Sequence, residues 1–322
     1  FPDVELALRN HLEQVSVNKL PLYTMMQYQL GWVDRDGSDT PPTFDSRVYG
    51  ALVLLAANSV SSNTAYFGNA AAAIELFHES VTVHEQMQTG DLGRDGLVPV
   101  WSIWGPAQAI NVGDGLHALA RLAVLKCQML GLTANGTIDS IAVLDDLALR
   151  YYEGQYLELT YQERVDITTF QYSTLARSKT GALLGGALAL GAMVGGASPL
   201  ALTTFKQLGS SLGELVQIRD DIEAIWSDTQ PQGRVLNKSK LFPVVHILEN
   251  GSLPDKRALG GVYFKRVMEA TDLQVIRQIL DGTDARVRSE DRKNSLLLEA
   301  QRLLTELPLA RQQFNQWQDV VT

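Results

Sequence analysis

Apolar positions recur at helical spacing along most of the chain, and the alternation typical of half-buried strands is scarce. This periodicity predicts helices over residues 4–26 (one helix or a pair), 46–60, 69–88, 107–130, 139–159, 170–193, 200–226, 242–248 and 273–305. Polar stretches containing Gly, Asp or Pro predict loops at residues 31–45, 90–99 and 227–241. No Gly/Ser linker or abrupt change in composition divides the chain, so we expect one all-α domain over residues 1–322, ending in a helix pair.

The most apolar stretch, residues 180–202, is long enough to span a bilayer. Ala and Gly dominate it, and both contribute little free energy to transfer into a membrane. This composition favours a central helix with close neighbours over a membrane span. We therefore predict no transmembrane segment.

Charge and cysteine content narrow the partners and the compartment. The net charge of −9 comes without the clustered Lys and Arg that a nucleic-acid surface needs, so no nucleic-acid partner is expected. The single cysteine, Cys127, excludes an intrachain disulfide framework, and its apolar surroundings predict a buried structural thiol. No signal peptide is visible, and the lack of disulfides favours the cytoplasm. The first residue is Phe1 rather than Met, which suggests that the start of the chain is missing.

Candidate metal chemistry lies near residue 220. Gln217 precedes Asp220 and Asp221 by three and four positions, so on a helix all three share one face. Adjacent carboxylates repel each other and are costly to bury unless a cation lies between them. Mg²⁺ prefers such oxygen ligands and bridges to substrate phosphates. The alternative is a solvated helix face, and the apolar flanks leave both interpretations open.

Two cations are candidates for phosphate binding. Lys179, next to Thr180, directly precedes the Gly/Ala-rich helix, where its charge could meet a phosphate. It could equally extend to solvent while its stem covers apolar surface. Arg94 lies in the loop at residues 90–99, where an arginine is usually solvated.

A series of motifs follows in a fixed order over roughly residues 46–250. They lie at residues 72–78, His84, 90–96, 101–105, 111–116, 154–158, 179–180, 217–221 and 237–240. Together they resemble the trans-isoprenyl diphosphate synthase (polyprenyl synthetase) family, which includes farnesyl and geranylgeranyl diphosphate synthases. The resemblance implies a helical bundle around a central apolar cavity, and a homodimer or heterodimer.

The first aspartate-rich motif of that family is degenerate here. Its three carboxylates correspond to Glu85, Gln86 and Thr89, which leaves one ionisable group on a helix face that normally holds magnesium ions. In the second motif the last acidic position is Ala224.

The element that resembles the isopentenyl diphosphate pocket has also changed. Its lysine corresponds to Ser46 and its later arginine to Tyr49, while Asp95 replaces the second arginine of a pair that begins with Arg94. Of the cations expected there, only His78 and Arg47 remain. Charge-assisted hydrogen bonds to phosphate contribute about 1.5–3 kcal/mol each, so we predict no ordinary condensation with isopentenyl diphosphate.

The allylic side is better preserved and implies most of the candidate site. By resemblance, Arg94, Lys179, Asp220 and Asp221 are the candidate catalytic residues, and the two aspartates hold Mg²⁺. The candidate substrate-binding residues are Phe77, His78, Val81, Glu85, Gln86, Thr180, Gln217 and Lys238. Phe77 either limits the depth of a prenyl tunnel or is simply part of the core.

Three interpretations follow. The first is an enzyme that ionises an allylic prenyl diphosphate and passes the cation to an unknown acceptor, or quenches it internally as terpene synthases do. The second is a catalytically weak subunit of a prenyl diphosphate synthase heteromer. The third is an unrelated helical scaffold. The retained Asp220, Asp221, Lys179 and Arg94 favour the enzyme.

Overall fold

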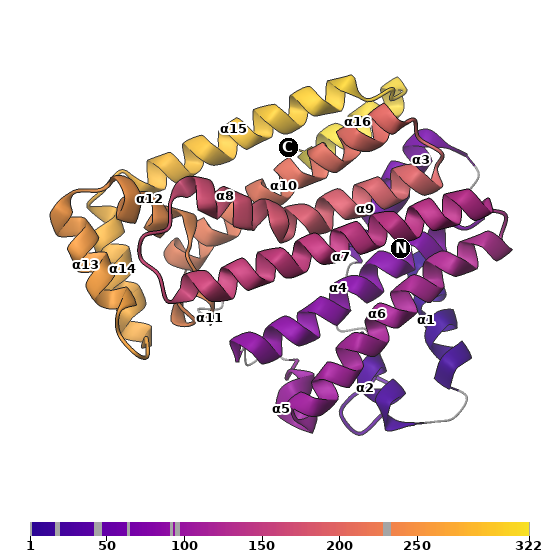
Figure 1. Cartoon of the computed structure of the whole chain (residues 1–322), viewed down its shortest axis with the longest axis horizontal. Coiled ribbons are helices and arrows are strands. Elements are labelled where there is room, and N and C mark those ends of the chain that lie inside the picture. The colour runs from indigo at the N-terminus through magenta and orange to yellow at the C-terminus, as the bar shows by residue number, and fades with distance from the viewer. Residues whose placement is uncertain are drawn as a thin grey trace. The chain divides into compact units, whose positions relative to one another are not determined.

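Helices are the only regular secondary structure in the part of the chain that the structure describes, which in this computed structural model comprises residues 2–16, 20–41, 47–62, 65–90, 93, 97–227 and 233–321 (Figure 1). Within these ranges, extended backbone is limited to isolated bridges such as that of Val33 with Asp39. The helices are α1 (Pro2–Val15), α2 (Pro21–Gln29), α3 (Val48–Val60), α4 (Phe67–Thr89), α5 (Val100–Trp104), α6 (Pro106–Met129), α7 (Ala134–Gln162), α8 (Thr169–Ser178), α9 (Thr180–Val194), α10 (Pro199–Trp226), α11 (Gly233–Leu236), α12 (Phe242–Asn250), α13 (Leu253–Tyr263), α14 (Ala270–Asp281), α15 (Ala285–Glu306) and α16 (Arg311–Val321). The predicted all-α fold class is confirmed.

The chain forms two compact units. Unit 1 comprises Phe1–Ala148, Gly186–Lys206 and Pro308–Gln313. Its central element is α4, which packs along α6 and contacts α3 and α1. Residues 70–77 of α4 are buried all round, because a run of alanines lets neighbouring helices approach from several sides.

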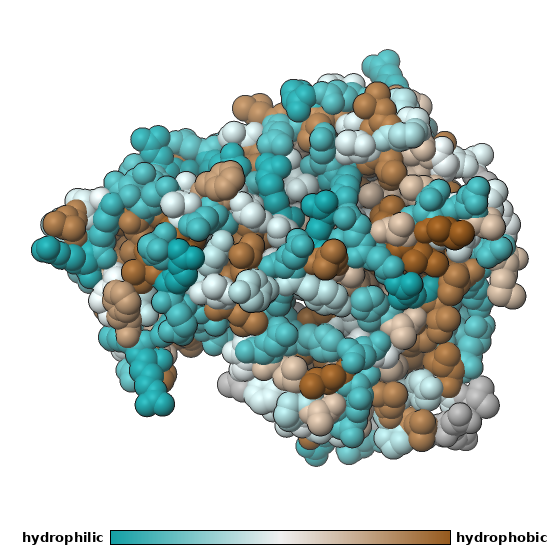
Figure 2. Space-filling model, viewed as in Figure 1, coloured by the Kyte–Doolittle hydropathy of each residue, from teal (hydrophilic) through white to brown (hydrophobic). Residues whose placement is uncertain are grey.

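The outer face of α6 carries an apolar stripe. Ile110, Leu122, Leu125 and Met129 lie on this face with 44–83% of their surface exposed. Figure 2 shows brown, apolar residues interspersed among polar ones over α6. Grouped exposed apolar residues of this kind are typical of interaction surfaces.

Unit 2 comprises Leu149–Gly185, Gln207–Leu307 and Phe314–Thr322. A buried carboxylate, Glu214 of α10, joins three of its helices. Glu214 accepts hydrogen bonds from Ser173 Oγ at 2.8 Å, Arg177 Nε at 2.6 Å and Arg292 Nη2 at 2.5 Å. Because these donors belong to α8 and α15, the pairing fixes both helices against α10.

A backbone break separates α8 from α9. Lys179 has φ −102° and ψ −91°, outside the helical region, so the helix predicted for residues 170–193 is two helices. Gly154 of α7 lies against the break, since a Cβ added there would lie 2.8 Å from the Ser178 carbonyl carbon. The sequence lacks a Pro or Gly at the break itself, so local pattern gave no signal for it.

Two glycine pairs then hold α9 against α10. A Cβ added to Gly213 would lie 2.4 Å from the Gly181 Cα, and one added to Gly209 would lie 2.6 Å from the Gly185 Cα. The two backbones are therefore in direct contact at two points, about one helical turn apart. The close neighbours expected of the Gly/Ala-rich stretch are confirmed.

Most other predicted helices are present with shifted ends. The opening segment is a pair, α1 and α2, while the single helix predicted over residues 273–305 is divided into α14 and α15. The division falls at residues 282–284, where Gly282 follows the last residue of α14. Helices α5, α11, α13 and α16 were not predicted. The predicted loop at residues 227–241 contains α11, and parts of that loop and of the loop at residues 90–99 lie outside the described residues.

The structure also bears on the expectations for membrane-spanning helices and for Cys127. No helix within the described ranges is long and apolar enough to cross a membrane. Cys127 is fully buried, and burial raises the pKa of its thiol to about 12. It is a structural, unreactive thiol, as predicted.

Candidate functional site

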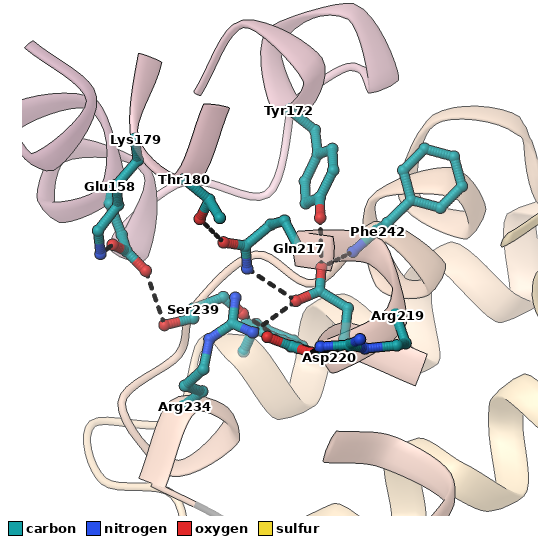
Figure 3. Close-up of polar contacts among 12 residues, drawn as sticks. Glu158, Tyr172, Lys179, Thr180, Gln217, Arg219, Asp220, Arg234, Ser239 and Phe242 are labelled. Carbon is teal, nitrogen blue, oxygen red and sulfur yellow. Dashed lines mark hydrogen bonds and ion pairs between the residues drawn. The ribbon is translucent and has the colours of Figure 1, made fainter. Parts of the chain in front are cut away.

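The candidate site of unit 2 is built where α9 begins and α10 ends (Figure 3). The glycine contacts between these helices bring Thr180 and Gln217 together, and Thr180 Oγ1 donates a hydrogen bond to Gln217 Oε1 at 2.7 Å. Gln217 Nε2 in turn donates to Asp221 Oδ1 at 3.1 Å, one turn further along α10. The structure thus brings Thr180 together with Gln217 and Asp221, two of the three residues predicted to share one face of this helix.

Asp221 is fully buried and surrounded by donors. Tyr172 Oη donates to Oδ2 at 2.6 Å, the Phe242 backbone N–H donates to the same oxygen at 2.8 Å, and Arg234 Nη1 lies 2.7 Å from Oδ1. Burial raises the pKa of Asp221 above that of an ordinary aspartate, although Arg234 and the hydrogen bonds oppose that rise. The carboxylate thus anchors α8, α11 and α12 on α10.

Asp220 has the opposite environment. Its side chain is 47% exposed and pairs with Arg219, whose Nη2 lies 3.0 Å from Oδ1. Only one of the two predicted metal ligands therefore presents oxygens to solvent. The expectation that both aspartates point to a shared cation is corrected for Asp221, because Arg234 already supplies its counter-charge.

The predicted phosphate-binding lysines are placed differently from each other. Lys179 is 7% exposed and its Nζ forms an ion pair with Glu158, so the lysine does not extend to solvent. Lys238 follows α11 in the left-handed backbone region, with φ 59°. Two residues on, Lys240 is buried: its Nζ donates to the carbonyl oxygens of Gln162 at 2.9 Å and Lys238 at 3.0 Å. Burial lowers the pKa of Lys240 to about 8.

The donor set in unit 2 fits a magnesium ion held mainly by its substrate. Among the described residues, no group of three His, Cys, Asp or Glu side chains could enclose a metal ion. Mg²⁺ commonly takes one or two protein carboxylates and completes its octahedron with waters and substrate phosphates. The half-exposed Asp220 offers such a ligand.

The residues predicted on α4 lie in unit 1. Phe77 has no exposed surface and its ring meets the His117 ring edge-on, with centroids 5.5 Å apart. Val81 is 2% exposed. Both are core residues of the α4–α6 interface in this structure, which favours the core interpretation of Phe77.

Further along α4, the degenerate motif is half-buried. Glu85 and Gln86 are both partly exposed, and Gln86 Oε1 is a buried atom with no hydrogen-bond partner among the described residues. An amide oxygen is a weaker cation ligand than the carboxylate it replaces. Arg94 and Ser46, which the family resemblance assigns to substrate binding, lie outside the described residues.

A cluster of polar side chains surrounds Arg47 in unit 1, and we call it the Arg47 cluster. Arg47 is 8% exposed, and its guanidinium meets Glu5 Oε2 at 3.2 Å, the Leu30 carbonyl oxygen at 2.8 Å and Glu79 Oε1 at 3.9 Å. The other members are Gln29, Tyr49, Glu75 and His78.

Several residues of these networks were missed by the sequence analysis. Glu158 lies in a motif that was noted, but no role was given to it. No local sequence pattern indicated a role for Arg234, Tyr172 or Glu79. Arg234 and Tyr172 contact a residue of another helix, and the direction of the side chains around Glu79 cannot be read from the sequence. A search for a buried cation to neutralise Asp221 would have pointed to the basic residues of the loop at residues 227–241.

Comparison with known proteins identifies the class. Residues 46–280 match the model of the polyprenyl synthetase family. The chain is 33% identical over 238 residues to geranylgeranyl diphosphate synthase of Mycobacterium tuberculosis, covering 72% of this chain and 67% of that protein. It is 31% identical over 222 residues to a short chain isoprenyl diphosphate synthase of Methanothermobacter thermautotrophicus, covering 66% of each. These matches span about two thirds of the relatives' length.

Solved structures agree. A polyprenyl synthetase from Streptomyces coelicolor A3(2) superposes with a TM-score of 0.88 at 25% identity, covering 100% of this chain and 97% of that one. A geranylgeranyl pyrophosphate synthase superposes with a TM-score of 0.86 at 19% identity, over 99% and 96% of the two chains, which supports the fold alone. The fold is that of the helical isoprenoid synthases.

The chain belongs to the polyprenyl synthetase (trans-isoprenyl diphosphate synthase) family. The resemblance inferred from the motifs is therefore confirmed, and so is the prenyltransferase class at the level of the family. The assignment of individual site residues, of Mg²⁺ and of a dimer stays a prediction.

Proposed function

We propose that this protein binds an allylic prenyl diphosphate with Mg²⁺, assists the departure of the diphosphate, and passes the allylic cation to an acceptor other than isopentenyl diphosphate. The observation that carries the proposal is the network of Thr180, Gln217 and Asp221 on two helices in backbone contact. Asp220 lies on the same helix, three residues after Gln217, so its half-exposed carboxylate is carried by a rigid support. Such preorganised groups suit a leaving group whose charge develops in the transition state.

Each residue has a defined part in this reaction. Asp220 would hold the ion, which stabilises the departing diphosphate when it is bound. Thr180 and Gln217 would position phosphate oxygens, and Lys238 would contribute charge from its turn. Lys179 would reach a phosphate only by leaving Glu158 or by sharing its protons with it. Arg94 is included by family resemblance.

The Arg47 cluster supports an acceptor without a diphosphate. Arg47 is already enclosed by Glu5, Glu79 and a backbone carbonyl, and the cluster also contains Glu75. A diphosphate of about three negative charges would meet more carboxylates than cations here. The free-energy cost of binding such a charge without enough cationic partners exceeds the about 1.5–3 kcal/mol that one remaining charge-assisted hydrogen bond contributes.

The test is diphosphate release from geranyl, farnesyl or geranylgeranyl diphosphate with Mg²⁺. We expect release in the wild type, a loss of at least hundredfold in Asp220→Asn, and no change in Asp166→Asn, an exposed aspartate of unit 2 that pairs with Arg164. Adding isopentenyl diphosphate should give no longer prenyl diphosphate. Chain elongation at an ordinary rate would contradict the proposed acceptor.

A second candidate function is favoured by one observation. The buried ion pairs Lys179–Glu158 and Asp221–Arg234 neutralise side chains that a catalytically active site would use to bind substrate or metal. This is expected of a subunit that supports a partner synthase. Absence of release with every substrate, together with stable association with an active synthase, would support this candidate instead.

We also propose that two chains associate through the apolar stripe on α6. The stripe presents Ile110, Leu122, Leu125 and Met129 on one helix face. Light scattering after size exclusion should give twice the chain mass, and Leu122→Glu with Leu125→Glu should give a monomer. A wild-type monomer at micromolar concentration would refute this.

A further inference from the structure

A cavity of about 570 Å³ opens between three helices of unit 2, α8, α12 and α15. Helix α12 contacts both of the others (Figure 1). The volume of the cavity lies within the range of small-molecule pockets, about 300–1,000 Å³. The function proposed above does not use this cavity, so its lining calls for an explanation of its own.

The charged side chains that line the cavity are basic. Arg177 comes from α8, Arg288 and Arg292 come from α15, and His246 of α12 adds a ring that can also carry a proton. The other polar side chains of the lining are hydroxyls and an amide, which donate hydrogen bonds. Among the described residues, no carboxylate lines the cavity. An anion that enters therefore meets mainly hydrogen-bond donors.

Two of the arginines are held in place by a fully buried carboxylate. Glu214 accepts hydrogen bonds from Arg177 Nε at 2.6 Å and from Arg292 Nε at 3.0 Å. Arg292 Nη2 also donates to Glu214 at 2.5 Å, and Arg177 Nη2 donates to Glu299 at 3.3 Å. These bonds use Nε and Nη2 of each guanidinium, which has further donors on Nη1 for a ligand. Side chains fixed in this way lose little conformational freedom when they bind an anion.

The third arginine is more exposed. The side chain of Arg288 is 58% exposed, and its Nε lies 3.0 Å from Asp284 Oδ2 within the same helix. Ion pairs in such contact with solvent are weak, because water screens the two charges. An anion in the cavity can therefore compete with Asp284 for this guanidinium.

Two aromatic side chains give the cavity an apolar part. Phe170 of α8 lines it with 79% of its surface exposed, whereas Phe242 of α12 is nearly buried, with its ring edge-on to Tyr172. A flat apolar group that stacks on Phe170 would remove this ring from water. A small inorganic anion alone would leave the ring and most of the volume unused.

We propose that this cavity binds a phosphate monoester with an aromatic body. A phosphate monoester carries about 1.5 to 2 negative charges and three acceptor oxygens near neutral pH. Three guanidiniums and several hydroxyls suit such a group, whereas a planar carboxylate is satisfied by a single guanidinium. The phosphate lies among Arg177, Arg288 and Arg292, and the aromatic body lies on Phe170.

The cavity shares one residue with the candidate site. The side chain of Phe242 lines the cavity, while its backbone N–H donates to Asp221 Oδ2 at 2.8 Å. The other lining residues have no part in the diphosphate chemistry proposed above. A test of binding must therefore separate the cavity from the candidate site.

The experiment is calorimetric titration of the full chain with 1-naphthyl phosphate. EDTA is present, so that metal-dependent binding at the candidate site is excluded. We expect one molecule bound per chain, with inorganic phosphate and 1-naphthol each binding at least tenfold more weakly. Equal affinity for inorganic phosphate would overturn the aromatic part of the proposal, and equal affinity for 1-naphthol would overturn the phosphate part.

Variants at exposed positions test the location without disturbing the fold. Arg288→Gln should weaken binding about tenfold, because it removes one charge-assisted hydrogen bond. Its matched control is Arg302→Gln, on the same helix and also paired with a carboxylate four residues away, which should leave the affinity unchanged. Phe170→Ala should weaken binding about fivefold, whereas Phe264→Ala, an exposed phenylalanine next to α13, should not.

Three results would overturn the proposal. The first is no binding of 1-naphthyl phosphate at millimolar concentration. The second is an equal loss of affinity in Arg288→Gln and Arg302→Gln, which would show unspecific attraction to surface charge. The third is a loss in Lys238→Gln without a loss in Arg288→Gln, which would locate the ligand in the candidate site. None of these outcomes depends on diphosphate release, so a failure of the proposed function would leave this inference standing.

Discussion

The ion pair of Asp221 with Arg234 should dominate the stability of unit 2 around the candidate site. Asp221 has no exposed surface, whereas the side chain of Arg234 is 30% exposed. Removing one partner of a fully buried pair costs about 3–5 kcal/mol. The partial exposure of Arg234 and the three hydrogen bonds that Asp221 retains reduce this, so we expect about 2–3 kcal/mol for Arg234→Gln at pH 7.

A double-mutant cycle isolates the pair. Asp221→Asn should cost a similar amount, because its amide would direct N–H groups at Arg234. The double variant Asp221→Asn/Arg234→Gln restores amide-to-amide pairing and should cost only about 1–2 kcal/mol, which corresponds to a coupling of about 3–4 kcal/mol. Urea unfolding followed by circular dichroism, with Asp166→Asn as a surface control, supplies the free energies.

The pH dependence gives an independent check. Burial already raises the folded-state pKa of Asp221 above its unfolded value, and loss of Arg234 removes a group that lowers it. The stability of Arg234→Gln relative to wild type should therefore be highest below about pH 4 and fall as pH rises through the folded-state pKa. A variant that is stabilised by Asp221→Asn, or a coupling below about 0.5 kcal/mol, would refute the view that Asp221 is a structural anchor rather than a free metal ligand.

Three further predictions concern unit 2. Lys179→Met should lower the free energy of unfolding by about 2–3 kcal/mol, because it leaves Glu158 buried without its cation. The double variant Lys179→Met/Glu158→Gln should recover at least half of that loss. An equal loss in the single and double variants would disprove the pairing. Gly209→Ala should destabilise by about 2–3 kcal/mol because its Cβ would lie 2.6 Å from the Gly185 Cα, whereas Gly261→Ala in α13, whose Cβ meets nothing within 4 Å, should stabilise by about 0.5–1 kcal/mol in the same denaturation assay. Burial lowers the pKa of Lys240 to about 8, so between about pH 8 and 10.5 the unfolded chain binds more protons than the folded chain, and wild-type stability should rise with pH over this window. Lys240→Met should remove that rise. A stability–pH profile of the variant that parallels the wild-type profile would contradict this prediction.

Local pattern predicted the parts of the site that depend on one helix. The spacing of Gln217 and Asp221 gave their contact on α10, and the adjacency of Lys179 and Thr180 to the glycine-rich stretch gave their position. The run of small residues also predicted close helix packing, which the glycine contacts show in detail. Motif order added the family, which periodicity alone could not supply.

Contacts between distant elements could not be predicted in the same way. The four groups around Asp221 come from α8, α10, α11 and α12, so no sequence window contains them. The break at Lys179 depends on packing against Gly154 of another helix. For His78 and Glu79, neighbours in sequence do not normally face each other on a helix, so their pairing followed only from the coordinates.

The paired glycines of α9 and α10 have an evolutionary consequence. Where two backbones touch, the distance between them no longer depends on side chains elsewhere, so Thr180 and Gln217 keep their spacing whatever happens to α4. Mutations can then accumulate in the α4 motif without disturbing the groups on α9 and α10. In such a chain, substitutions can change the residues of the α4 motif during evolution while the contact between Thr180 and Gln217 is retained.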